Sequence, residues 1–347
     1  MYFHPLNFIR FALALGVILF HYGVNYFPFN SGPLNTLIVN SSFRVSFFFF
    51  ISGFVMCMVY AKQAGNLTAA YFYKRRFARI FPLYWLAFVL TVIVVVFVNK
   101  AAPRGLNIIL HGIGLQSLNP GHVLDLNYPT WSISVELIFY LIFPFLLKWL
   151  VKFGPAKLLA VAFGIWALQS VQHIFFVECV YNGTKVSEEF ISAFPLWHFS
   201  TFFAGMAAAR LIALNAVPGL ITKNSVLFMV LPLLAIIYII YIPNPVLKYV
   251  HNGLLVPVFA LFIVALYYDG SVIGLSLSHR RIVNLGDFSY GLFIFQYPVW
   301  VICCRIADSG FIKSGWFFMI YLGCLFGATW FINRYFEKPL MKKIRRE

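Results

Sequence analysis

Long apolar runs separated by short polar segments extend along almost the whole chain. Ten of these runs approach the roughly 20 residues that an α-helix needs to cross a bilayer. They cover approximately residues 6–26, 43–60, 80–98, 131–150, 158–177, 193–213, 225–242, 253–269, 284–305 and 315–333. The stretch 105–130 fits a re-entrant or interfacial helix. The pattern predicts an all-α, polytopic membrane protein of about ten transmembrane helices, with residues 1–347 as a single integral-membrane domain.

The composition supports a membrane protein. Of the 347 residues, 62% are hydrophobic and 10% are charged, whereas soluble globular proteins carry about 25% charged residues. The first apolar run lacks the basic start and the cleavage site of a signal peptide, so we expect it to be retained. The five cysteines show neither metal-ligand spacing nor a disulfide framework, and we predict no metal site.

The basic residues are distributed unevenly between the two sets of loops. The net charge of +16 would suit nucleic acid in a soluble protein. In a membrane protein, basic residues gather in cytoplasmic loops instead. With the N-terminus inside, 18 of the 26 basic residues fall in inner loops or the C-terminal tail, and six fall in outer loops. We therefore predict two cytoplasmic termini, contact with membrane lipids and no nucleic-acid partner.

Arg10 and His21 lie within the first apolar run. Ionisable groups inside a span are costly and rare, so they indicate function. Eleven residues of α-helix place the two side chains within ~20° of one face and ~16 Å apart along the axis. His21 is a candidate general base, since imidazole is the usual base near neutral pH. The alternative is a core histidine that only satisfies a backbone carbonyl.

A second basic group follows the second run, in the segment K-R-R-F-A-R from Lys74 to Arg79. Arg76 and Arg79 are three residues apart and share one helical face. Their planar guanidinium groups suit phosphate oxygens, and we assign Arg10, Arg75, Arg76 and Arg79 to binding of a phosphorylated ligand. The enrichment of basic residues in cytoplasmic loops of membrane proteins would by itself also produce such a cluster.

Glu136 is the acid placed well within a predicted span. It is a candidate catalytic residue that could orient His21, or it could pair structurally with Arg44. Arg44 opens the second run at its outer end, where topology does not call for a cation, so we expect it to bind Glu136 or an acyl carbonyl. Ser52 and Gly53 are interpreted as positions of close helix packing.

Six segments in order resemble motifs of the membrane-bound acyltransferase-3 family of bacterial inner membranes. They are N-F-I-R-F-A-L-A-L-G-V-I-L-F-H, S-F-F-F-F-I-S-G-F, K-R-R-F-A-R-I-F-P-L-Y-W, W-S-I-S-V-E-L-I-F-Y-L-I-F-P, L-G-D-F-S-Y-G-L-F-I-F-Q-Y-P and F-E-K-P-L. The resemblance covers almost the whole chain. The sequence departs from the family pattern at Gln296, where many members have histidine, and at Asn7, which replaces a commonly acidic residue.

The resemblance implies a multi-pass O-acetyltransferase of the bacterial inner membrane. Such an enzyme transfers an acyl group, usually acetyl, from cytoplasmic acyl-coenzyme A to a hydroxyl of a cell-envelope or exported glycan, or of a lipid-linked sugar, at the periplasmic side. Acetyl-coenzyme A is then a donor substrate, and no cofactor is bound. His21 is the implied base, the arginines contact coenzyme A, and Glu136 is an active-site acid. Arg44, Trp131 and Ser134 are assigned to substrate binding.

Two questions stay open at the level of sequence. His21 could deprotonate the acceptor hydroxyl for direct attack, or it could itself be acylated transiently. A transporter or channel with Arg10, His21 and Glu136 along its path is the alternative function. We expect the outer loops 99–130 and 178–192 to decide the choice of acceptor.

Overall fold

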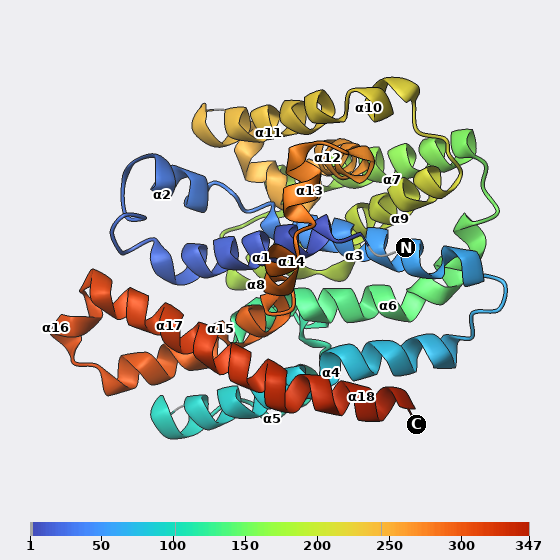
Figure 1. The fold of residues 1–347 in the computed structure, drawn as a ribbon. Helices are drawn as coiled ribbons and strands as arrows, with labels where there is room; N and C mark the ends of the chain where they lie inside the picture. Colours follow the sequence, from blue (N-terminus) through green and yellow to red (C-terminus); the bar gives the residue numbers. More distant parts are fainter. Residues whose placement is uncertain (1–2, 101, 244, 347) are drawn as a thin grey trace.

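The computed structural model describes residues 3–100, 102–243 and 245–346, and it contains no strand in that part of the chain. The prediction of an all-α protein is confirmed. Most of the longer helices lie side by side in roughly one direction (Figure 1). The α-helices are α1 (Pro5–Ile18), α2 (Gly32–Val39), α3 (Arg44–Tyr60), α4 (Ala69–Ile93), α5 (Gly105–Ile113), α6 (Trp131–Leu150), α7 (Pro155–Phe175), α8 (Lys185–Ala193), α9 (Phe199–Ala213), α10 (Gly219–Lys223), α11 (Ser225–Tyr241), α12 (Val256–Tyr268), α13 (Val272–Leu277), α14 (Arg280–Leu285), α15 (Ser289–Ile306), α16 (Ser309–Ile312), α17 (Gly315–Ile332) and α18 (Lys338–Arg346).

Short turns of other helix types extend or connect these elements. The π-helical turns are η1 (Leu19–Gly23), η3 (Val94–Val98), η6 (Phe176–Val180) and η9 (Asn333–Glu337). The 3₁₀ turns are η2 (Ala61–Gln63), η4 (Gln116–Leu118), η5 (Tyr128–Thr130), η7 (Pro195–His198) and η8 (Pro245–Asn252). Local sequence explains the starts of α4 and α8. At each start a threonine hydroxyl, of Thr68 and of Thr184, accepts a hydrogen bond from a free backbone N–H of the first turn.

Seven helical stretches are long and apolar enough to cross a membrane, or up to eight if the bent pair of η8 and α12 is one span. The seven are Pro5–Gly23, Arg44–Gln63, Ala69–Val98, Tyr128–Leu150, Pro155–Val180, Arg280–Ile306 and Gly315–Ile344. Each overlaps one of the predicted apolar runs. The bent pair turns by 65° between its two helices.

The other three predicted spans are helical but shorter than expected. They correspond to α9 with 15 residues, α11 with 17 and α12 with 13. The predicted number of about ten is therefore corrected to seven or eight candidate spans. In α9, most side chains from Ser200 to Ala209 are buried, so this run is a core helix. An apolar run alone does not distinguish a core helix from a spanning one.

The closest packing in the bundle joins α3 and α9 at two glycines. A Cβ atom on Gly53 would lie 2.0 Å from the carbonyl oxygen of Phe202, and one on Gly205 would lie 2.0 Å from that of Phe50. Only glycine fits such an approach, which confirms the packing role predicted for Gly53. Together these contacts hold α3 firmly, and α3 carries one wall of the cavity described below.

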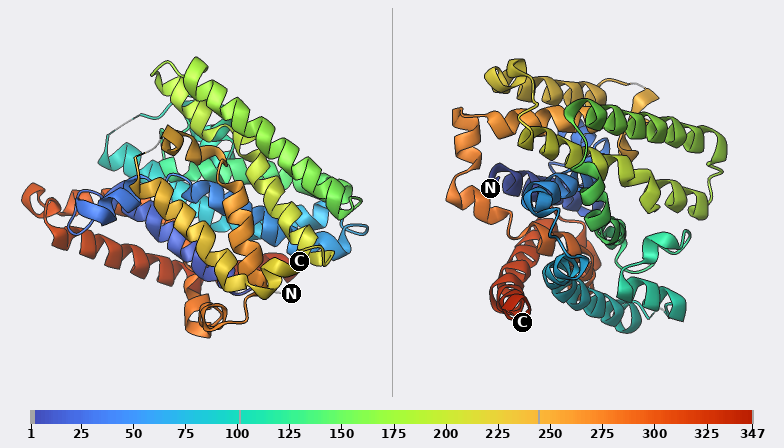
Figure 2. Two further views of the ribbon diagram at one scale, coloured as in Figure 1. Left: turned by 90° about the horizontal axis from the view of Figure 1, so that it is seen from above. Right: turned by 90° about the vertical axis from the view of Figure 1, so that its right-hand side faces the viewer.

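Both ends of the chain lie at the same end of the bundle (Figure 1, and the left view of Figure 2). The N-terminal half of α1 starts there, and the basic helix α18 ends there. This arrangement is consistent with two termini on one side of a membrane. Which side is cytoplasmic stays a prediction from the loop charges.

Candidate functional site

A cavity lies where α1, α3, α4, α6 and α15 meet, and it encloses about 880 Å³, part of it open to solvent. Apolar side chains of α3 line one wall. Four predicted site residues line the others, namely Arg10, Arg76, Arg79 and Glu136. With three arginines and one glutamate, the lining carries an excess of positive charge.

Arg76 and Arg79 point to the cavity from one face of α4. Arg76 Nη2 donates a hydrogen bond of 3.2 Å to the Tyr60 hydroxyl, and its guanidinium group lies 6.0 Å from the ring centre of Tyr140. Within the described residues, the buried Nε of Arg76 has no hydrogen-bond partner. Arg79 donates to Glu337 over 2.5 Å. Two guanidinium groups in the lining of a cavity suit an anionic ligand.

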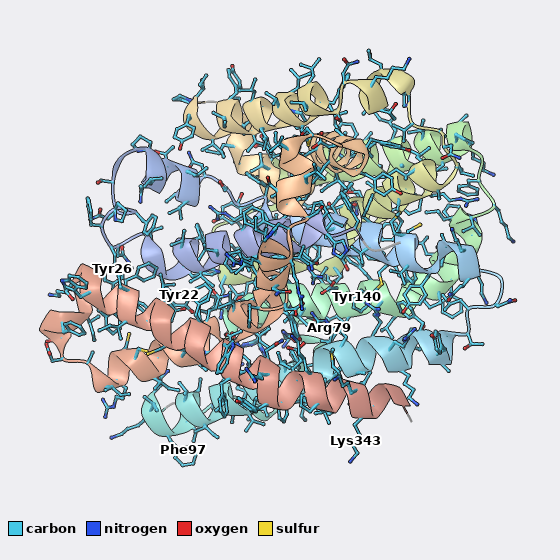
Figure 3. The ribbon with its side chains drawn as sticks, viewed as in Figure 1. Tyr22, Tyr26, Arg79, Phe97, Tyr140 and Lys343 are labelled. Carbon is cyan, nitrogen blue, oxygen red and sulfur yellow. The ribbon has the colours of Figure 1, made fainter. Side chains whose placement is uncertain are left out.

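Glu136 is held by two hydroxyl groups. Ser52 Oγ donates to Glu136 Oε1 over 2.5 Å, and the Tyr140 hydroxyl donates to the same oxygen. The carboxylate bonds to these residues rather than to His21 or Arg44, which corrects both predicted pairings. The face of α6 that carries Glu136 is turned toward α3, and Ser52, which was interpreted as a packing position, also lines the cavity. Figure 3 shows Tyr140 close to Arg79 near the middle of the bundle.

His21 lies outside this cavity, at a half-buried position in the π-helical turn η1. Its ring centre is 4.7 Å from that of Tyr128 and 5.1 Å from that of Phe20, each in an edge-on arrangement. Figure 3 shows the neighbouring Tyr22 farther from the C-terminal end of the bundle than Arg79.

The π-helical turn explains why Arg10 and His21 do not line one common cavity. The predicted spacing assumed an uninterrupted α-helix, but η1 begins at Leu19, and its wider turn changes the direction of the following side chains. Single π-helical turns are rare and occur often at functional sites. His21 is therefore directed to Tyr128, whereas Arg10 remains at the cavity.

One short segment contacts both His21 and the cavity. It runs from Tyr128, whose ring meets His21, to Ser132, which lines the cavity. Ser132 Oγ donates to the carbonyl oxygen of Pro129 over 3.2 Å, which ties η5 to the start of α6. Four residues of helix separate Tyr128 from Ser132 by ~6–8 Å along the axis. The segment Tyr128–Ser132 therefore contacts His21 at one end and lines the cavity at the other.

Arg44 packs within the protein at the end of α2. Its Nη2 donates to the carbonyl oxygens of Leu37 over 3.2 Å and Ile38 over 2.6 Å. These are among the last carbonyls of α2, which helix geometry leaves unsatisfied. A Cβ atom on Gly16 would lie 2.8 Å from Arg44 Nε, so the side chain also lies against α1. Its charge is near enough to act on His21.

Trp131 and Ser134, both assigned to substrate binding, lie beside the cavity and do not line it. The Trp131 ring is 5.4 Å from that of His198 and 5.8 Å from that of His251. Ser134 is fully buried, and its hydroxyl lies 2.7 Å from that of Ser117. Both contacts fix the start of α6 against the neighbouring loops.

Arg75 also lies outside the cavity. It is exposed and donates to the Tyr71 hydroxyl over 2.5 Å, one turn earlier in α4. Helix periodicity alone does not separate Arg75 from the cavity, because residues 75 and 79 are four apart and are also neighbours on α4. Tyr140 is a site residue that the sequence could have indicated. It follows Glu136 by four residues and therefore lies on the same face of α6.

The two positions that depart from the family pattern are packed in the interior. Gln296 is fully buried, and its Nε2 donates to the carbonyl oxygen of Phe293 over 2.7 Å. Asn7 Nδ2 donates to the carbonyl oxygen of Val283 over 3.3 Å, and a Cβ atom on Gly286 would lie 2.4 Å from Asn7 Cβ. Neither residue lines the arginine cavity.

These features define a helical, multi-pass membrane protein with a basic internal cavity. The profile of the acyltransferase-3 family, described as an acyltransferase domain, matches residues 3–334, and the chain belongs to this family. It is therefore a membrane acyltransferase, which favours acyl transfer over the transporter alternative.

Two curated proteins are similar to the chain. Acyltransferase MdmB of Streptomyces mycarofaciens is 28% identical over 311 residues, which are 84% of this chain and 77% of that protein. Protein 2 in the picA locus of Rhizobium radiobacter is 45% identical over 53 residues, which are 15% of this chain and 28% of that protein. No solved structure matches the chain at a significant level.

Proposed function

We propose that this acyltransferase moves an acyl group, in the first place acetyl, from cytoplasmic acyl-coenzyme A to a hydroxyl of a cell-envelope or exported glycan. The reaction would take place in the bacterial inner membrane, with the acceptor at its outer face. The observation that carries the proposal is the arginine cavity, because Ser132 in its lining lies four positions after Tyr128, whose ring contacts His21.

The donor fits the cavity in one direction. The phosphate groups of coenzyme A would bind Arg10, Arg76 and Arg79, which come from the N-terminal halves of α1 and α4. Guanidinium groups bind phosphate through paired N–H donors. The pantetheine arm would then pass Glu136, whose carboxylate can accept from its amide N–H groups. The thioester would reach Ser132, within one helical turn of Tyr128 and His21.

The chemistry needs one proton carrier. The acceptor hydroxyl oxygen attacks the thioester carbonyl carbon while His21 takes the hydroxyl proton. The carbon–sulfur bond then breaks, and the imidazolium returns the proton to the leaving thiolate. The products are an ester and free coenzyme A, so no further reactant is required. Transient acylation of His21 gives the same products in two steps.

The test uses purified full-length protein and its consumption of acetyl-coenzyme A, followed by release of the free thiol. Replacing His21→Gln should lower the rate about 10²–10⁴-fold, the usual contribution of a positioned general base, and leave donor binding intact. His279→Gln is a matched control, since His279 caps α14 at an exposed site. An unchanged rate in His21→Gln, or wild-type protein that neither binds nor consumes an acyl-coenzyme A, contradicts the proposal.

The acyl group and the acceptor class have a separate readout. Mass spectrometry of envelope glycans from cells with and without the chain should differ by the mass of one acetyl group. Glycans of equal mass in the two strains would contradict the assigned acceptor. An acyl-protein adduct on His21, trapped by rapid quenching before acceptor is added, distinguishes the covalent route from direct attack.

A further inference from the structure

A second pocket lies between two segments that the sequence predicts as outer loops. It holds about 680 Å³, part of it open to solvent. Arg104, Asn107, His122 and Asp125 line it from the first segment, and Lys185 lines it from the second. The loops 99–130 and 178–192 were expected to decide acceptor choice, and the fold brings them to one pocket. None of these five side chains is used by the arginine cavity.

Asp125 is the centre of a polar network in this pocket. Its carboxylate accepts hydrogen bonds from Asn107 Nδ2 over 2.8 Å and from Lys185 Nζ over 2.6 Å, and its Oδ2 lies 2.7 Å from His122 Nδ1. Partial burial acts to raise the pKa of Asp125, but hydrogen bonds and charges from Lys185 and His122 outweigh it and lower the pKa. The carboxylate is therefore ionised at neutral pH.

Glu189 fixes the two segments to each other. Its side chain is 2% exposed and accepts from the backbone N–H groups of Gly121 over 2.8 Å and Val123 over 2.9 Å. Lys185 lies 3.5 Å from its other oxygen. Because α8 is bonded to the loop before Asp125, the pocket walls are held together in advance of ligand binding. Preorganised walls lower the cost of ordering a ligand site.

The same loop leads from the pocket to His21. Three residues separate Asp125 from Tyr128, so their Cα atoms are at most ~11 Å apart. The Tyr128 ring is 4.7 Å from that of His21. A ligand in the outer pocket is therefore within the length of a sugar residue or two of the proposed base.

The donors and acceptors of the pocket suit neighbouring hydroxyl groups. A hydroxyl both donates and accepts, so it needs a carboxylate or an amide oxygen beside N–H donors. Asp125 supplies the acceptor, and Arg104, His122 and Lys185 supply donors. Arg104 is exposed, and its contact with His122 is long, at 3.4 Å, so most of its five N–H groups face the pocket or solvent.

We propose that this outer pocket binds the glycosyl unit that carries the acceptor hydroxyl. Asp125 and Arg104 hold the hydroxyls of the sugar ring, and the Asp125–Tyr128 segment directs one of them to His21. The proposal rests on the proposed function and names the acceptor site within it. It assigns no residue of the donor cavity, so the two sites can be tested separately.

The experiment measures donor and acceptor steps in the same full-length variants. The acceptor probe is envelope glycan prepared from cells that lack the chain, titrated at saturating acetyl-coenzyme A. Asp125→Asn and Arg104→Gln should each raise the apparent KM for this glycan about tenfold, the effect of losing a hydrogen bond to a charged group. In the absence of acceptor, both variants should consume acetyl-coenzyme A at a rate within about twofold of the wild-type rate.

Matched controls come from the same predicted side of the membrane. Lys248→Gln breaks a similar exposed pair, since Lys248 lies 2.5 Å from Glu178, and Arg305→Gln removes an exposed arginine. Neither residue lines the outer pocket. Both control variants should keep the wild-type KM for the glycan. Retained acetyl-coenzyme A consumption in the pocket variants shows that they are folded.

Each outcome decides one of the two proposals. An unchanged glycan KM in both pocket variants, or an equal rise in the controls, overturns the acceptor pocket. Wild-type protein that consumes acetyl-coenzyme A but leaves the glycan unmodified overturns the acceptor class. Wild-type protein that consumes no acyl-coenzyme A overturns the proposed function itself. A glycan KM raised only in the pocket variants supports the assignment.

Discussion

Arg79 on α4 and Glu337 in η9 form an ion pair in which Nη1 and Oε1 are 2.5 Å apart. The Glu337 side chain is 2% exposed and that of Arg79 is 28% exposed. Asn333 Nδ2 donates to the second carboxylate oxygen over 2.7 Å. The C-terminal helix therefore holds an arginine of the cavity wall in place, which links the end of the chain to the proposed donor site.

Replacing Glu337→Gln should release Arg79 and destabilise the fold. Losing a hydrogen bond between charged groups costs about 1–3 kcal/mol, and Arg79, which is 28% exposed, is left without its counter-charge. We expect a lower melting temperature in detergent and a KM for acetyl-coenzyme A raised severalfold. Titration of the donor and a thermal unfolding curve measure the two effects.

The neighbouring residue gives the control for that variant. Lys338 lies 3.0 Å from Asp287, and both side chains are about half exposed, at 51% and 44%. Exposed pairs of this kind contribute about 0–1 kcal/mol. Lys338→Ala should therefore change neither the melting temperature nor the KM noticeably. Equal effects in the two variants would contradict a specific role for Glu337.

Arg76→Lys should weaken donor binding even though the charge is kept. The planar guanidinium group lies against the Tyr60 ring at 5.7 Å and the Phe72 ring at 5.8 Å, and Arg76 lines the cavity. Lysine offers neither the stacking nor the fork. The KM for acetyl-coenzyme A should rise about tenfold.

A truncated donor makes the Arg76 test specific. S-acetylpantetheine lacks the nucleotide and its phosphates, so wild type and Arg76→Lys should use it equally well. Arg75→Lys is the control, because Arg75 is exposed and lies outside the cavity. If Arg76→Lys raised the KM for the truncated donor as much as the KM for acetyl-coenzyme A, Arg76 would not act by binding the phosphate groups.

Glu136→Gln should lower the acyl-transfer rate about tenfold or more, because the amide cannot keep the charge that Ser52 and Tyr140 stabilise. Steady-state kinetics with saturating donor gives the effect. Glu188→Gln is the control, since Glu188 is exposed in the first turn of α8. Wild-type kinetics in Glu136→Gln would show that the charge of Glu136 has no role in acyl transfer.

Gly53→Ala should prevent stable packing of α3 on α9. The added Cβ would lie 2.0 Å from a backbone oxygen, which cannot move away as a flexible side chain can. We expect a loss of about 3 kcal/mol or more, at the upper end of overpacking effects. Gly164→Ala is the control, because no atom lies within 4 Å of a Cβ there. Equal expression and melting temperature for the two variants would contradict this reading of the contact.

Much of the site could be predicted from local sequence. The 3.6-residue period placed Arg76 and Arg79 on one face of α4, and apolar length marked the helix that carries Glu136. Those properties depend on neighbouring residues along the chain. The count of spans could not be predicted as well, because the apolar runs in α9 and α12 look like spanning helices and are shorter elements.

The sequence by itself determined an all-α membrane acyltransferase with ionisable groups inside its first and fourth long helical stretches, because hydrophobic length and motif order are local properties. Only the tertiary structure decided which charges meet. It placed Glu136 with Ser52, turned His21 to Tyr128 through a π-helical turn, and used Arg44 to cap α2. These partners come from distant parts of the chain, and helix rotation and packing, which no local period encodes, bring them together.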